Sequence, residues 1–135
     1  MFLIDTSSWT HALRRKGDAD IRKRVERLVL AAQAAWCDVV RLELWHGARS
    51  QEDRQTLHQL EGELPVLEIN SRVWDTACDL ASFARGKGLT VPSADLIIFA
   101  CARVNGALLE HNDRHYDRLG ALLANSDLPR RQTAG

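Results

Sequence analysis

Apolar positions along the chain follow two alternating patterns, short continuous runs and longer stretches with helical spacing. The continuous runs predict buried strands, since strands covered on both faces lack an alternating pattern. The four predicted strands are Phe2–Ile4, Ala34–Val40, Val66–Ile69 and Ala107–Leu109. Runs of this kind favour a mostly parallel sheet.

The segments between these runs carry the apolar spacing and end signals of helices. Asp18 is suited to cap one of them, and Gly86 and Gly88 to end another. The expected helices cover residues 8–13, the segment after Asp18, residues 42–48, 52–60, 71–86, 92–104 and 116–123. Strands alternating with helices predict a layered α/β fold, which we assign to one domain over residues 1–125 with a flexible tail over 126–135.

Composition narrows the class of protein. The 18 basic and 18 acidic side chains balance, so attraction to nucleic acid has to come from local patches. No apolar run is long enough to span a bilayer, and Asp5 interrupts the N-terminal run, so we expect a soluble, cytoplasmic protein without a membrane partner. Cys37, Cys78 and Cys101 are widely spaced and are expected to be reduced, buried thiols.

Four acidic residues stand where a parallel α/β fold would bring them to one edge of its sheet. Asp5 and Asp113 follow strands, Glu43 is expected in the first turn of a helix that leaves a strand, and Asp95 begins the helix that leads into the last strand. Each alone could be a cap or a surface charge. Together they would repel, by roughly 4 kcal/mol per pair at 4 Å and an effective dielectric near 20, so the cluster predicts a hard divalent cation.

Four stretches that carry these acids resemble a known family. They are FLIDTSSW, RLELWHG, VPSADLIIFACA and ALLEHNDRHYDRL, and their order and spacing cover nearly the whole chain. The chain resembles the PIN domain family, and specifically its VapC-type toxin ribonucleases. The resemblance implies a three-layer α/β/α fold with a central, mostly parallel sheet of four to five strands.

The resemblance also implies a function. It implies an endoribonuclease that uses Mg²⁺, or Mn²⁺, to activate water, as the toxin of a toxin–antitoxin module. It makes Asp5, Glu43, Asp95 and Asp113 the catalytic and metal-binding acids, with Thr6 or Ser7 beside them. Asp5 and Asp95 would hold the first ion, in keeping with the oxygen ligands that hard cations take. The implied partners are RNA, a cognate antitoxin and a second copy of the chain.

The chain departs from the family pattern around the last acid. His111 stands where the family often has Thr or Ser, and His115 where it often has a further acid. His111, Asp113 and His115 could form a transition-metal site, or the histidines could orient the carboxylate or meet phosphates.

Residues outside the acidic cluster leave further choices open. The basic stretches Arg14–Lys16 and Arg22–Arg27 are either a solvated helix face or a contact for RNA phosphates. Trp9, near Asp5, is either a core residue or a platform for base stacking.

Two other classes of protein remain possible. One is a catalytically weak PIN fold that serves as a binding module. The other is an aspartate-based phosphotransfer protein, although Ser7 and Asn70 stand where such proteins would need acids. No P-loop motif is present.

Overall fold

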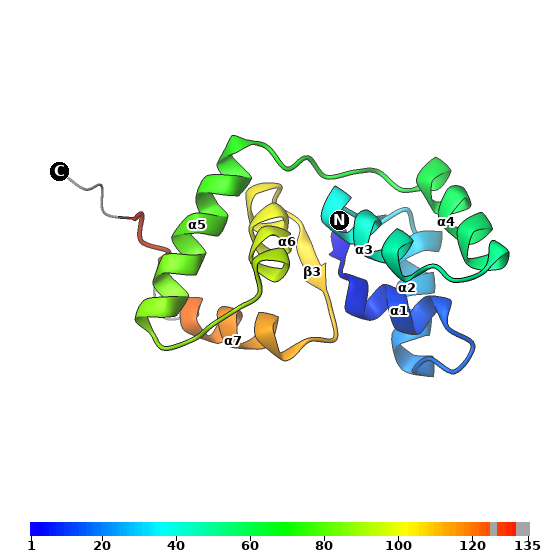
Figure 1. Cartoon of the computed structure of the whole chain (residues 1–135), viewed down its shortest axis with the longest axis horizontal. Coiled ribbons are helices and arrows are strands. Elements are labelled where there is room, and N and C mark those ends of the chain that lie inside the picture. The colour runs from blue at the N-terminus through cyan, green and yellow to red at the C-terminus, as the bar shows by residue number, and fades with distance from the viewer. Residues whose placement is uncertain (125–126, 132–135) are drawn as a thin grey trace.

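The computed structural model describes residues 1–124 and 127–131. Within them, three strands are separated along the chain by groups of helices, seven helices in all (Figure 1). The strands are β1 (Phe2–Ile4), β2 (Ala34–Ala35) and β3 (Leu108–Glu110). The helices are α1 (Thr6–Leu13), α2 (Ala19–Leu30), α3 (Asp38–Gly47), α4 (Gln51–Glu63), α5 (Ser71–Gly86), α6 (Ser93–Val104) and α7 (Arg114–Leu123). The predicted mixed α/β fold with a parallel sheet is confirmed, but the expected four to five strands were wrong, since the described residues form three.

The sheet is parallel, in the order β2-β1-β3. Leu3 pairs with Ala35 on one side and with Leu109 on the other, and both Leu3 and Ile4 are fully buried. Because β1 and β3 are parallel, the residues that follow them come to the same edge. The Asp5 amide donates a 2.9 Å hydrogen bond to the Glu110 carbonyl at that edge.

The second predicted strand is much shorter than the apolar run from Ala34 to Val40. It ends at Ala35, and α3 begins at Asp38. Val40 and Leu44, four residues apart, both face the core, so helical burial decides the conformation of the end of the run.

The predicted strand Val66–Ile69 is reduced to one parallel bridge between Trp36 and Val66. Trp36 donates to the Pro65 carbonyl at 3.2 Å and accepts from the Leu67 amide at 2.8 Å. The partner strand is only two residues long, and Val66 is 49% exposed, so no longer ladder forms.

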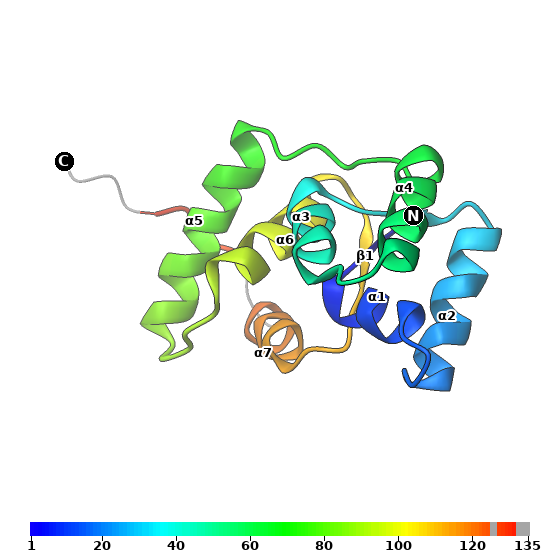
Figure 2. The same cartoon turned by 45° about the vertical axis from the view of Figure 1, so that its right-hand side comes forward.

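Helices surround this sheet and pack in pairs. α1 lies beside α2 and α5 beside α6, while a long connection from α4 to α5 crosses the molecule (Figures 1 and 2). Trp9 on α1 is 2% exposed and meets Trp36 edge to face, with ring centroids 6.4 Å apart. It is a core residue, and the suggestion that it stacks on bases was wrong.

The expectation that all three cysteines are buried is met by two of them. Cys37 and Cys101 are buried free thiols as predicted, but Cys78 is exposed because it lies on the outer face of α5.

In the segment that follows α7, Arg131 pairs with Asp79 of α5 at 3.2 Å. The domain boundary at residue 125 stays a prediction, because residues 125–126 and 132–135 lie outside the described part of the chain. Among the described residues, no helix has the length and apolar character needed to cross a membrane.

Candidate carboxylate site

Asp5 lies at the carboxyl end of β1 and caps the N-terminus of α1. Its Oδ2 accepts hydrogen bonds from the Ser7 amide at 2.9 Å and the Ser7 hydroxyl at 2.6 Å. Its Oδ1 accepts a 2.7 Å bond from the Tyr116 hydroxyl. Asp5 is only 4% exposed, so hydrogen-bond donors take the place of water around its charge. These donors come from Ser7 in α1 and Tyr116 in α7.

Asp95 lies in the first turn of α6, as predicted, just after Pro92. One carboxylate oxygen is 2.9 Å from His115 Nδ1, and the other is 3.4 Å from the Tyr116 hydroxyl. Burial raises the pKa of Asp95, and the charges of Asp113 and Asp5 raise it further against the opposing bond to His115. A raised carboxyl pKa of this kind is expected where several carboxylates lie close together.

Asp113 follows β3 and caps α7, accepting a 2.8 Å hydrogen bond from the His115 amide. The His115 ring places Nδ1 3.2 Å from its carboxylate. One donor atom each from Asp95, Asp113 and His115 lie within 4.8 Å of one another. Opposite ligands of a bound Mg²⁺ are about 4 Å apart, so the spacing fits one hard cation.

Glu43 approaches from α3 and lies in its second turn, because the helix begins at Asp38. The expected place in a first turn was wrong. Its Oε1 accepts a 2.8 Å hydrogen bond from Thr6. Burial of its carboxyl group raises the pKa of Glu43, and the charges of Asp5 and Asp95 add to this effect. Glu43 and Asp5 lie beside Asp95, Asp113 and His115, but they are not among the residues whose ligand atoms lie within 4.8 Å of one another.

Tyr116 is the site residue that the sequence did not indicate. Its ring is 2% exposed and its hydroxyl lies between Asp5 and Asp95. Burial and the neighbouring Asp5 carboxylate raise its pKa well above the usual range, which keeps the hydroxyl protonated and donating. The available signal was weak: it is the chain's only tyrosine and lies one helical turn after Asp113.

The two histidines have different places. His115 contacts two of the predicted acids, whereas His111 lies outside the three-residue group. The His111 ring accepts a 3.3 Å bond from the Asp113 amide at Nδ1, and its other nitrogen is 3.7 Å from Asp117. The structure therefore does not bring the two histidines together as a transition-metal pair.

Comparison with known proteins identifies the family. A family model described as the PIN domain matches residues 2–122. The chain is 34% identical over 127 residues to Ribonuclease VapC18 of Mycobacterium tuberculosis, covering 90% of this chain and 89% of that protein. It is also 34% identical over 121 residues to Ribonuclease VapC11 of the same species, covering 87% and 90%.

Solved structures share the fold. FitAcB from Neisseria gonorrhoeae superposes with a TM-score of 0.72 at 20% identity, over 90% of this chain and 94% of that one. A DNA-bound VapBC from Salmonella typhimurium superposes with a TM-score of 0.69 at 23% identity, over 87% and 91%.

Proposed function

The chain belongs to the PIN domain family, and we propose that it is a metal-dependent endoribonuclease that acts as the toxin of a toxin–antitoxin pair. Relatives named as VapC ribonucleases match about nine-tenths of its length at 34% identity. The observation that carries the proposal is the crowding of carboxylates at the edge where β1 and β3 end. Such crowding is costly unless a cation or a substrate group offsets it.

The proposed cofactor is Mg²⁺, with Mn²⁺ as the alternative. Asp5, Glu43, Asp95 and Asp113 would supply the oxygen atoms that such ions prefer. The 4.8 Å spacing joins Asp95, Asp113 and His115, so Asp5 and Glu43 would complete the site from beside this group. The chemistry that this ion would supply is a lowered pKa for water and neutralisation of charge on the scissile phosphate.

The chain's own residues hold the acids in place. The Tyr116 hydroxyl donates to Asp5, Thr6 donates to Glu43, and His115 contacts both Asp95 and Asp113. These contacts fix the direction of each carboxylate, which is what a metal site requires of its supporting residues.

The hydrogen bonds of Asp5 and Ser7 disfavour a nucleophile supplied by a protein side chain. Both oxygens of Asp5 accept hydrogen bonds and the side chain is almost fully buried, which disfavours the phosphotransfer alternative. The Ser7 hydroxyl donates a hydrogen bond to Asp5 and accepts a 2.9 Å bond from the Asn112 backbone amide. It is therefore already engaged both as a donor and as an acceptor. Activated water is therefore the nucleophile we propose.

The proposed partners are an RNA substrate, an antitoxin protein and a second copy of the chain. Structural neighbours include DNA-bound forms of FitAB and of VapBC from Salmonella typhimurium. A basic side chain of an antitoxin would be drawn to the acidic site, because it offsets the same repulsion as a metal ion.

Replacement of Asp95 by Asn tests the proposal. Asn keeps the shape next to the buried Leu96 but loses the charge that a hard cation requires, so single-turnover cleavage of total RNA in Mg²⁺ should fall by about 100-fold or more. Glu52→Gln removes an exposed helix first-turn acid and should cleave at the parental rate. Folded Asp95→Asn protein, checked by circular dichroism, that cleaves normally would contradict the assignment.

A further inference from the structure

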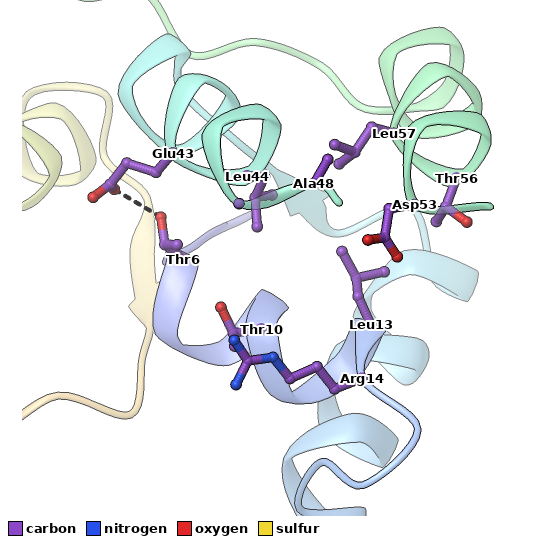
Figure 3. Close-up of a pocket in the computed structure, with 11 residues that line it drawn as sticks. Thr6, Thr10, Leu13, Arg14, Glu43, Leu44, Ala48, Asp53, Thr56 and Leu57 are labelled. Atoms are coloured by element: carbon purple, nitrogen blue, oxygen red, sulfur yellow. Dashed lines mark hydrogen bonds between the residues drawn. The ribbon is translucent and has the colours of Figure 1, made fainter. Parts of the chain in front are cut away.

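A cavity of about 140 Å³ opens beside the carboxylate site, between α1, α3 and α4 (Figure 3). At one end lie Thr6 and Glu43, joined by their 2.8 Å hydrogen bond. At the other end the Arg14 side chain lies near Thr10, on the face of α1 that lines the cavity. The cavity thus connects the acids of the site to a positive charge.

Regular helix geometry sets the spacing of this connection. Thr6 and Thr10 are four residues apart on one side of α1, and Arg14, which follows the last residue of the helix, lines the same cavity. A rise of 1.5 Å per residue places the Arg14 backbone about 12 Å from that of Thr6 along the helix axis, and the Arg14 side chain points back toward Thr10 (Figure 3). This distance allows groups on a single extended strand to reach both ends of the cavity.

The guanidinium group of Arg14 has no partner within residues 1–124 and 127–131, although two acids line the same cavity. Glu43 is bonded to Thr6, and Asp53 accepts a 3.0 Å hydrogen bond from the Arg49 amide. By contrast, Arg24 in the neighbouring helix is paired with Glu110 at 3.1 Å. Arg14 is therefore a cation available to a ligand.

The loop after α1 holds further positive charge next to Arg14. The Arg22 guanidinium donates to the backbone carbonyls of Arg14 at 2.6 Å and Arg15 at 3.3 Å. These bonds hold the loop against α2 and place a second guanidinium beside the backbone of Arg14. The loop therefore adds positive potential to the end of α1, which favours the approach of an anion.

We propose that Arg14 binds a phosphate of the RNA that neighbours the scissile phosphate, so that the strand runs from the carboxylate site along α1. This assignment rests on the proposed ribonuclease function. The planar guanidinium fork matches the geometry of a phosphate, and the Thr10 hydroxyl supplies a further donor on the same path. Arg14 is thus a positioning residue for substrate, separate from the acids.

RNA binding without metal tests the assignment directly. The probe is a fluorescein-labelled, mixed-sequence single-stranded RNA, followed by anisotropy in EDTA at several salt concentrations. Arg14→Ala should weaken binding about tenfold and reduce the salt slope by about 0.7, the value for one lost phosphate contact on a single strand. Arg14→Lys should recover part of the affinity, because it restores the charge without the fork.

The matched control is Arg72→Ala, which removes an exposed arginine at the start of α5, a helix that lies on the opposite side of the molecule from α1 (Figure 1). It should bind RNA like the parent. Parental affinity and salt slope in Arg14→Ala, or an equal loss in Arg72→Ala, would overturn the assignment.

A cleavage experiment in Mg²⁺ separates this inference from the function on which it rests. Arg14→Ala should need about ten times more RNA for half-maximal rate, while the single-turnover rate at saturation stays near that of the parent. If the parent itself does not cleave RNA, the proposed function fails, and the binding measurements still decide whether Arg14 contacts phosphate. A fall in the saturated rate alone, with unchanged affinity, would contradict a positioning role.

Discussion

Replacing Tyr116 with Phe removes one hydroxyl from the centre of the carboxylate site. That hydroxyl donates at 2.7 Å to Asp5, a residue that is 4% exposed. Phe preserves the ring, which stacks on Phe99 with centroids 6.4 Å apart, so packing of α7 against α6 should persist. The change therefore removes the short hydrogen bond to the buried Asp5 carboxylate and the longer 3.4 Å contact with Asp95, and it leaves the packing of the ring in place.

The magnitude follows from the state of Asp5. Hydrogen bonds to charged groups contribute about 1.5–3 kcal/mol, and a buried acceptor that loses its donor cannot turn to water instead. The free energy of unfolding in EDTA should fall by about that amount. For a chain of this size the loss corresponds to a decrease in Tm of roughly 5–12 °C.

Urea unfolding in EDTA, with an unchanged dependence on denaturant, is the appropriate assay. Ser8→Ala is the matched control, since Ser8 is fully buried and its hydroxyl has no hydrogen-bond partner in the described part of the chain. It should leave stability unchanged or raise it slightly. If Tyr116→Phe is as stable as the parent, the hydroxyl does not support Asp5 and our description of the site's charge balance is wrong.

Further predictions concern metal, charge and partner. Mg²⁺ at 100 times its dissociation constant should stabilise the fold by about 2.7 kcal/mol in thermal melts, and identical Tm values with EDTA would count against a shared ion site. Glu43→Gln should raise metal-free stability by roughly 0.5 kcal/mol at neutral pH, because it relieves repulsion and can still accept from Thr6. The pKa of Glu43 is raised in the folded state. The gain in stability should therefore vanish as pH falls below the ordinary carboxyl range, because Glu43 of the parent is then protonated in both the folded and the unfolded state. A gain that persists at such low pH would refute the charge explanation. Expression of the chain alone should arrest growth unless a small partner is co-expressed, and normal growth with RNA cleavage in vitro would refute the toxin assignment while leaving the nuclease intact.

The positions of the acids were predictable because connectivity alone fixes them. Asp5 follows a strand, Asp95 begins a helix marked by Pro92, and Asp113 follows the last strand. In a parallel sheet these features define one edge, whatever the details of packing. The sequence could therefore place three acids near one another without knowledge of any contact.

Details that depend on tertiary packing could not be read in this way. The run that ends in Val39 and Val40 suits a strand by composition, yet both residues belong to α3 because that helix buries Val40 against the core. This shift also moves Glu43 into a second turn. Tyr116 gave only a weak signal, since a tyrosine on a helix face indicates burial and not the partner of its hydroxyl.

The bond between Tyr116 and Asp5 joins residues 111 positions apart. A ribosome that adds about 5–20 residues per second makes Asp5 several seconds before Asp113, His115 and Tyr116 exist. β1, the middle strand, must likewise wait for β3 before its second edge is paired. The nascent chain therefore lacks a complete carboxylate site until the residues of α7 have been made, and the synthesising ribosome is not exposed to an assembled site before that point.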